Sequence, residues 1–229
     1  MATYVLLHGA YQGGWIWQRV APHLRAAGNR VFAPTLDGCA ERRHALRPGI
    51  DTESQAAEIS EMLFFEDLHD VVLVGTSCGG MVAARVAETS RERIGRIVLA
   101  DALALFNGEA VSDHVKRAGA VTDGVATGPT PEDAANRMFA SLNEPTKAWA
   151  LARYTPHPVA AMAAPVKLDK FWQQEWKASV IWCRQSVNPP VAHQKRAADT
   201  LKARWYELDT GHYPMLTEPV ALARLIMAE

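Results

Sequence analysis

Short, almost wholly apolar runs recur along the chain, and longer stretches with helical spacing separate them. The runs cover residues 4–7, 30–33, 71–74, 96–100 and 179–183, with a weaker sixth run at 203–208. The first five do not alternate between apolar and polar positions, so both faces of each strand must be covered. This pattern predicts strands buried inside a mostly parallel sheet.

The stretches between these runs have the apolar spacing of amphipathic helices, at residues 15–27, 52–65, 81–88, 190–201 and 217–227. The first is followed by Gly28, a residue that suits the end of a helix. The second begins with Thr52 and Gln55 at the spacing of a capping box. Strand–helix alternation of this kind predicts a doubly wound α/β sheet of about six strands with right-handed crossovers.

One segment, residues 106–178, interrupts the alternation. It lacks a strand pattern, and its short helical stretches are cut by prolines at 129, 131, 145, 156, 158 and 165. We expect it to form a helical cap, with residues 1–105 and 179–229 forming the core. Its aromatic side chains either pack in the interior or line an apolar substrate pocket. They are Phe139, Trp149, Tyr154, Phe171, Trp172 and Trp176.

Composition and charge narrow the partners. The chain has 229 residues, 24 of them basic and 25 acidic, and the net charge of −1 gives no reason to expect nucleic acid or a membrane surface as partner. Three widely spaced cysteines argue against a disulfide framework, and no zinc-binding motif is present. The first residues lack the features of a signal peptide or membrane span. We therefore expect a cytoplasmic monomer or homodimer that acts on a small molecule without a cofactor or metal.

The strongest chemical signal follows the third apolar run. Gly75, Ser77 and Gly79 form a Gly-x-Ser-x-Gly pattern between a predicted strand and a predicted helix. In that context the serine sits on a sharp, strained turn with its hydroxyl exposed. The N-terminus of the following helix favours negative charge developing at the turn. We predict Ser77 to be a nucleophile.

A serine hydroxyl needs a base to take its proton. His212 lies between the last predicted strand and the last predicted helix. Loops at the C-terminal ends of parallel strands gather at one edge of the sheet, so His212 can meet Ser77 there. We predict His212 to be the general base.

A nucleophilic serine also requires donors for the oxyanion of the tetrahedral intermediate. The expected donors are the backbone N–H of Cys78, next to the nucleophile, and one N–H from the loop after the first strand. Ala10 is the natural choice in that loop. We expect the neighbouring His8 to have a structural role, hydrogen-bonded within the loop.

These motifs together resemble those of the α/β-hydrolase superfamily. The resemblance covers residues 3–101 and 179–227 and is strongest for the branch that contains plant methylesterases, hydroxynitrile lyases and their bacterial relatives. It implies a carboxyl-ester or related acyl hydrolase without a cofactor. It rests on His8-Gly9-Ala10, Thr35-Leu36 with Gly38 and Glu41-Arg42, Gly75-x-Ser77-x-Gly79-Gly80, and Gly211-His212.

The chain departs from the family pattern in three places. Thr76 stands where most members have histidine, at a position that only packs. Gly9 and Tyr213 stand where a hydroxynitrile lyase would have threonine and lysine, which counts against cyanohydrin cleavage. The family's usual acid lies in the loop after the strand at 179–183, but residues 184–190 contain no carboxylate.

Asp101 is our candidate for the missing acid. It follows the run 96–100, so its side chain emerges at the same edge of the sheet as Ser77. Some α/β-hydrolases resemble this arrangement, and the chain order Ser77, Asp101, His212 fits the fold. A carboxylate there would fix the tautomer of His212 and stabilise its charged form. The alternatives are Asp209, a neutral partner such as Ser186 or Asn188, or an Asp101 that only caps the next turn.

The sequence therefore predicts a serine hydrolase that cleaves a small, mostly apolar ester, carbamate, amide or lactone through an acyl-enzyme. A lyase or cofactor-free oxygenase that uses the same histidine and aspartate is the alternative. A binding protein without catalytic activity is a third hypothesis. Asp37, Glu41 and His44 follow the second strand and could hold their loop together or line the entrance of the pocket. We expect a structural rather than a catalytic role for them.

Overall fold

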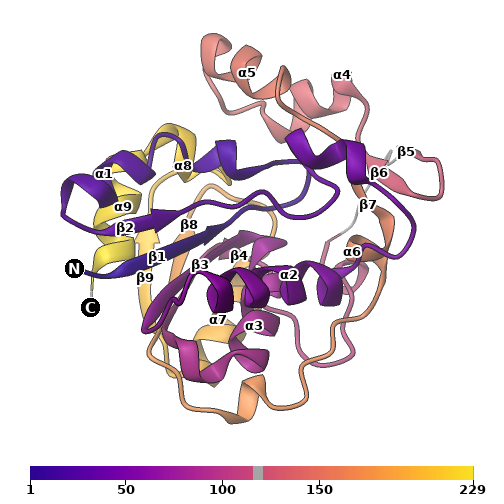
Figure 1. Ribbon diagram of the computed structural model, residues 1–229. Coiled ribbons are helices and arrows are strands. Elements are labelled where there is room, and N and C mark those ends of the chain that lie inside the picture. Colours follow the sequence, from indigo (N-terminus) through magenta and orange to yellow (C-terminus); the bar gives the residue numbers. More distant parts are fainter. Residues whose placement is uncertain (116–120, 229) are drawn as a thin grey trace.

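A six-stranded sheet forms the centre of the protein in the computed structural model, which describes residues 1–115 and 121–228 (Figure 1). All neighbouring strands are parallel, in the order β2-β1-β3-β4-β8-β9. The predicted α/β class, strand number and sheet type are thus confirmed. The strands are β1 (Thr3–Leu7), β2 (Arg30–Phe32), β3 (Val71–Ser77), β4 (Ile94–Ala102), β8 (Ala178–Cys183) and β9 (Arg204–Leu208).

Helices cover both faces of this sheet, as Figure 1 shows. One face carries α2 (Thr52–Phe65), α3 (Gly79–Thr89) and α7 (Val191–Leu201), and the other carries α1 (Ala21–Ala26), α8 (Pro214–Thr217) and α9 (Pro219–Met227). Within the described part of the chain, no helix has the length and apolar character that crossing a bilayer requires.

The continuous apolar runs divide between two hydrophobic cores. Val5 and Leu7 of β1 face the core under α2 and α3, whereas Tyr4 and Leu6 face the core under α1 and α9. Successive strand residues point to opposite faces, so a strand buried on both sides needs apolar residues at every position. This is the physical reason why the runs show no alternation.

The strand order places a topological switch at β1. This strand pairs with β2 on one side and with β3 on the other, so the crossovers leave in opposite directions. Ligands of open α/β sheets bind at the carboxyl ends of the strands at such a point. The loops after β1 and β3 are therefore the expected borders of a site.

One predicted helix is divided in two. The prediction of one helix at 15–27 is wrong, because the 3-10 helix Gly14–Trp17 is followed by a separate α1. The helix predicted at 217–227 is α9, which begins two residues later, at Pro219. Pro22 and Pro219 lie in the first turns of α1 and α9, where the missing N–H costs no hydrogen bond, so each proline begins a new helix. The predicted end of the first helix near Gly28 is confirmed.

The predicted capping box of α2 is displaced by one residue. The N-cap is Asp51, whose Oδ1 accepts from the Ser54 N–H at 2.8 Å, while the Ser54 hydroxyl accepts from the Asp51 N–H at 3.0 Å. Thr52 and Gln55 lie inside the helix and are buried. Gln55 instead reaches the loop after β2, where its side-chain amide donates to the Asp37 carbonyl at 3.1 Å.

The segment between β4 and β8 contains strands, which the sequence did not predict. β5 (Val121–Thr122), β6 (Ala126–Gly128) and β7 (His157–Pro158) form a small antiparallel sheet. Strands of two or three residues are too short to show periodicity, so their pairing defines them. The division into core and cap stays a prediction. The helices here are α4 (Pro131–Asp133), α5 (Glu144–Leu151), α6 (Val159–Ala163), the π-helix Ala134–Met138 and the 3-10 helices Val111–Asp113 and Phe171–Gln173.

Candidate active site

Ser77 lies at the turn between β3 and α3. Its φ of +48° is in the left-handed region. This conformation costs energy for a residue with a Cβ, and such backbone strain is found at functional turns. The surrounding glycines make the turn sterically feasible. A Cβ on Gly75 would lie 2.6 Å from the Gly79 carbonyl oxygen, and a Cβ on Gly79 would lie 2.5 Å from the His8 carbonyl oxygen. The Gly-x-Ser-x-Gly pattern thus has a steric cause at both glycines.

Asp101 occupies a bulge near the end of β4. The ladder between β3 and β4 pairs Thr76 with Ala100 and then Ser77 with Ala102, so Asp101 is an extra residue. Its φ is +45°, a region that aspartate tolerates better than most residues. A bulge changes the direction of a side chain locally. Here the bulged residue is fully buried, and its carboxylate meets the loop after β9.

The structure brings Asp101 and His212 together. Asp101 Oδ2 lies 2.5 Å from His212 Nδ1. Asp101 Oδ1 accepts from the Gln194 side-chain amide at 2.8 Å and from the Cys183 N–H at 3.3 Å. A buried carboxylate needs such donors because burial removes its water. The bond at Nδ1 also leaves Nε2 as the ring nitrogen available to other groups.

The alternative partners of His212 are less well placed. The Ser186 hydroxyl lies 3.5 Å from His212 Nδ1, a longer contact to the nitrogen that already faces Asp101. Asn188 accepts from the Ser186 hydroxyl through its carbonyl. The exposed Asp209 carboxylate contacts Gln185 at 3.2 Å and Arg184 at 3.4 Å. Asp101 is thus the carboxylate that contacts the ring.

Ser77 and His212 line the same cavity, of about 420 Å³. Their hydroxyl and ring, both in the described part of the chain, do not hydrogen-bond directly in this structure. Catalytic hydrogen bonds are often long in free enzymes and shorten when substrate binds. The predicted nucleophile and base therefore border one and the same cavity.

The loop after β1 lines the cavity beside Ser77. A Cβ on Gly9 would lie 2.6 Å from the Ser77 Cβ, so this loop passes directly beside the serine. Ala10 and Cys78 both line the cavity. Among the residues that the structure describes, the Ala10 N–H has no hydrogen-bond partner. The predicted oxyanion donors thus lie beside Ser77, and Ala10 has a free donor.

His8 supports this loop from behind. Its Nδ1 lies 2.8 Å from the Gly9 carbonyl oxygen, and its Nε2 accepts from the Leu36 N–H at 3.0 Å. Complete burial lowers the pKa of His8 to about 4, so the ring is neutral at physiological pH. The prediction that His8 is hydrogen-bonded within the loop is confirmed, and its structural role stays a prediction.

Comparison with known proteins shows the family to which the chain belongs. Residues 4–225 match the sequence profile of the Alpha/beta hydrolase family. The chain belongs to this family. The predicted resemblance is thereby confirmed.

Individual relatives agree with the family match. The chain is 38% identical over 111 residues to the carbendazim hydrolyzing esterase of Nocardioides sp., covering 48% of this chain and 46% of that protein. It is 29% identical over 162 residues to methylesterase 8 of Arabidopsis thaliana, covering 70% and 55%. The chain thus spans about half the length of the curated relatives it matches.

A solved structure shows the same fold over nearly the whole chain. An extracellular α/β-hydrolase from a Paenibacillus species superimposes with a TM-score of 0.84. The match covers 99% of this chain and 98% of that one, at 22% sequence identity. The architecture around the candidate site is therefore that of the α/β-hydrolase family.

The cavity of this α/β-hydrolase is mainly apolar. Leu103, Val111, Met138 and Met162 contribute to its wall, and the Cys78 thiol contacts the Met162 sulfur at 3.5 Å. In the described part of the lining, Arg137 is the one residue that is always charged, and there is no carboxylate. Met138 and Met162 come from the predicted cap, whereas none of the six cap aromatic residues considered as a pocket lining is among the described lining residues. The residues of the loop after β8 that line it are Gln185, Ser186, Val187, Asn188 and Pro189.

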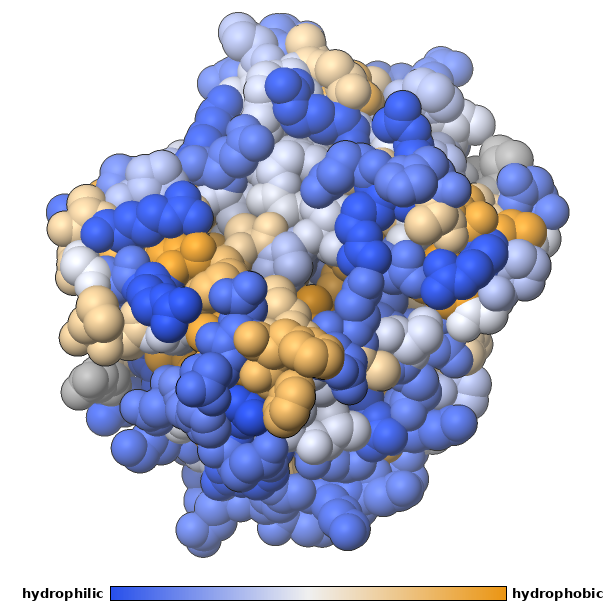
Figure 2. All heavy atoms as spheres, viewed as in Figure 1, coloured by the Kyte–Doolittle hydropathy of each residue, from blue (hydrophilic) through white to orange (hydrophobic). Residues whose placement is uncertain are grey.

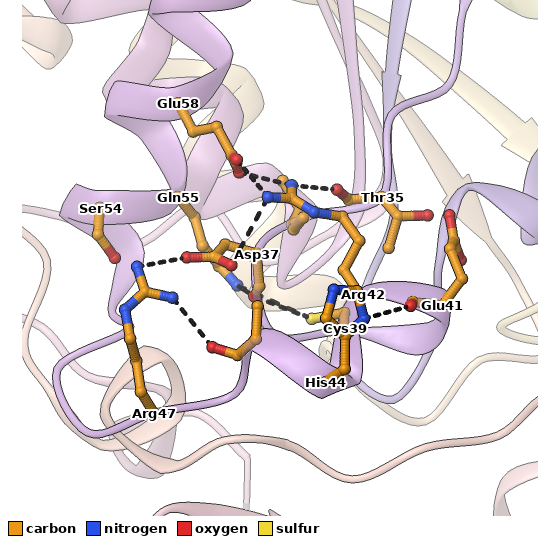
Figure 3. A network of polar contacts seen from close by, with 12 residues as sticks. Thr35, Asp37, Cys39, Glu41, Arg42, His44, Arg47, Ser54, Gln55 and Glu58 are labelled. Carbon is orange, nitrogen blue, oxygen red and sulfur yellow. Dashed lines mark hydrogen bonds and ion pairs between the residues drawn. The ribbon is translucent and has the colours of Figure 1, made fainter.

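The loop after β2 is held by a separate polar network, shown in Figure 3. Asp37 forms ion pairs with Arg47 at 2.8 Å and with Arg42 at 3.6 Å. Arg42 also forms an ion pair with Glu58 of α2, which raises the pKa of the guanidinium. Asp37 therefore fixes its loop against α2, as expected for a structural residue.

The other charged residues of this loop do not line the cavity. Glu41 and His44 contact each other locally, with His44 Nδ1 3.1 Å from the Glu41 carbonyl oxygen (Figure 3). The buried Cys39 thiol lies 3.4 Å from His157 Nδ1, and burial raises its pKa to about 12. A protonated thiol is a poor nucleophile. Cys39, Cys78 and Cys183 are all free.

Across 1–115 and 121–228, no cluster of three or more histidine, cysteine, aspartate or glutamate side chains could hold a metal ion.

Exposed apolar residues away from the cavity include Phe64 and Phe65 at the end of α2, and Figure 2 shows apolar surface over that part of the molecule.

Proposed function

We propose that the protein is a serine hydrolase that cleaves a small, mostly apolar carboxylic ester through an acyl-enzyme. The proposal rests on the arrangement of three side chains. Ser77, on a strained turn, lines the same cavity as His212, whose ring is held at 2.5 Å by the buried Asp101. Relatives named as esterases support hydrolysis as the reaction class.

Acylation begins when His212 Nε2 takes the proton of the Ser77 hydroxyl as Oγ attacks the substrate carbonyl. Asp101 holds the tautomer that leaves Nε2 unprotonated and then stabilises the imidazolium. The N–H groups of Ala10 and Cys78 stabilise the oxyanion. The imidazolium gives its proton to the leaving alcohol as the C–O bond breaks.

Deacylation repeats these roles with water. His212 removes a proton from the attacking water, and the second tetrahedral intermediate collapses to release the acid and regenerate the Ser77 hydroxyl. No cofactor is needed in this sequence of steps. Carbamates, amides and lactones can use the same groups, because each presents a carbonyl to the serine.

The cavity supports a small substrate. Its volume of about 420 Å³ is near the lower end of the range typical of small-molecule pockets. Its wall contains methionine, leucine and valine side chains beside a limited set of polar groups. Such a lining favours an apolar acyl or alcohol group. The cytoplasmic location and the monomeric or dimeric state stay predictions.

The test combines covalent labelling with turnover. We expect phenylmethylsulfonyl fluoride to add one sulfonyl group at Ser77, found by peptide mass spectrometry, and p-nitrophenyl acetate to be hydrolysed. Ser77→Ala should lower kcat on the order of 10⁶-fold, because the nucleophile is gone. Carbendazim and small methyl esters belong in the substrate panel because of the names of the relatives.

A matched control removes a hydroxyl elsewhere. Ser60→Ala deletes an exposed contact with Thr89 and should leave the rate unchanged. A wild-type protein that is neither labelled nor active on any ester would contradict the proposal and favour the lyase or oxygenase alternative.

A further inference from the structure

Tyr213 is a second residue of the His212 loop that borders the cavity. It follows His212 directly and lines the same space. Its exposed fraction is only 3%, and its ring packs on Phe139 at 4.9 Å and against His212 at 5.2 Å between centroids. The side chain is therefore held in place between the wall and the imidazole.

The hydroxyl of this tyrosine has no partner in the protein. Among the described residues, none hydrogen-bonds to it, although buried polar groups are almost always hydrogen-bonded. The oxygen is also not among the polar atoms sealed from solvent, so it retains accessible surface. Tyr213 itself lines the cavity where the proposed substrate would lie. The nearby Tyr154, in contrast, donates to the Pro129 carbonyl at 2.8 Å.

The hydroxyl can act as a donor at physiological pH. Burial raises the pKa of Tyr213 well above its ordinary value, and the neighbouring Tyr11 and Tyr154 raise it further. The described lining contains no carboxylate that would compete for the proton. An acceptor for the hydrogen bond of the Tyr213 hydroxyl therefore has to come from the substrate or from water.

The position of the tyrosine indicates which part of the substrate it meets. In the proposed function, on which this inference rests, His212 delivers a proton to the leaving alcohol, so the side of the cavity next to its ring receives that alcohol. The oxyanion donors, Ala10 and Cys78, belong to other loops. A donor adjacent to His212 is thus suited to the leaving group.

We propose that the Tyr213 hydroxyl donates a hydrogen bond to a second oxygen in the alcohol portion of the ester. The enzyme then favours esters whose leaving alcohol carries an ether or carbonyl oxygen a few bonds from the scissile oxygen. This assigns Tyr213 as a specificity-determining residue that contacts substrate, and it names a substrate class more closely than the apolar wall does.

The test uses two acetates of the same length. Butyl acetate and 2-methoxyethyl acetate differ by one CH₂ replaced with oxygen in the alcohol. Wild-type enzyme should have the higher kcat/KM for the methoxyethyl ester. Tyr213→Phe should lower kcat/KM for that ester by about 2- to 12-fold, the size of one neutral hydrogen bond, and leave butyl acetate within about twofold.

Two comparisons separate this role from a structural one. Tyr154→Phe removes a hydroxyl that is hydrogen-bonded within the protein and lies outside the cavity lining. It should change kcat/KM for the two acetates by the same factor. Methyl pentanoate and methyl 3-methoxypropanoate place the same replacement on the acyl side. Tyr213→Phe should not discriminate between them.

The outcomes are distinct. An equal loss on both acetates, no loss on either, or a selective loss only on the acyl-side pair would overturn the role of Tyr213 while hydrolysis itself continues. Absence of turnover with all four esters, together with an unlabelled Ser77, would contradict the proposed function and this inference with it. Thermal unfolding of both variants checks that they fold.

Discussion

The edge of the central sheet and the segment between β4 and β8 are built in different ways. At the edge, Ser77 and Asp101 lie at the ends of buried strands of seven and nine residues. In the segment, the described strands have two or three residues, and its longest helix, α5, has eight. Long buried strands fix their ends in space, whereas short elements take their positions from their neighbours.

The sheet edge carries the groups proposed to react, whereas the segment between β4 and β8 contributes to the choice of substrate. The groups proposed to react come from β3, β4 and the loop after β9, which the parallel ladder aligns. The segment supplies apolar wall residues such as Met138 and Met162. Substitutions at the edge should therefore change the rate for every ester, and substitutions in the wall or at Tyr213 should change the preference among esters.

The largest effect after loss of the nucleophile is expected at the acid. Asp101→Asn should lower kcat on the order of 10⁴-fold for every ester, because the amide no longer selects the tautomer and charge of His212. Steady-state kinetics with p-nitrophenyl acetate measures it. Asp209→Asn is the matched control, since that carboxylate is exposed and contacts Arg184 and Gln185, and its rate should be near wild type. The reverse ranking would move the acid to Asp209.

A smaller effect is expected where the first loop passes the serine. In Gly9→Ala the new Cβ would lie 2.6 Å from the Ser77 Cβ, so the turn or the loop must move. A displacement of about 1 Å at a reacting group costs roughly 10²-fold in rate. We expect this loss in kcat for both butyl acetate and 2-methoxyethyl acetate. Gly28→Ala, where a Cβ meets nothing within 4 Å but φ is +82°, should lower the melting temperature and leave kcat unchanged. Wild-type kcat in Gly9→Ala would show that the two loops are not tightly packed.

The smallest effect concerns the stability of the edge as pH changes. The pKa of the buried His8 is lowered from 6.5 to about 4, so below pH 6.5 the unfolded chain binds a proton that the folded protein does not. His8 therefore removes about 2 kcal/mol of stability between pH 7 and pH 5. Urea unfolding at both pH values should show this difference relative to His8→Gln, whose amide oxygen can still accept from Leu36. An identical pH dependence in the two proteins would contradict a neutral, buried His8.

Much of the sheet could be predicted because its cause is visible in the sequence. Residues 71–74 and 97–100 are apolar at every position, and the structure uses both faces of those strands. The Gly-x-Ser-x-Gly turn was predictable for a similar reason, since the glycines are required by close backbone contacts. In both cases a single local requirement dictates the residue type.

Other features leave weaker signals. Pro22 and Pro219 do mark new helices, and a stricter use of proline would have located the starts of α1 and α9. The bulge at Asp101 depends on how two strands pair, and the short strands β5 to β7 depend on each other. The role suggested for Tyr213 rests on a hydroxyl without a protein partner, which only the folded surroundings reveal.

The extra residue in β4 suggests how such sites can be transplanted. The register with β3 shifts at the extra residue and pairing resumes at Ala102 opposite Ser77, while pairing with β8 has already ended at Ala100 opposite Ile181. A carboxylate can thus be grafted onto this strand by inserting one residue, with the length of every other strand unchanged.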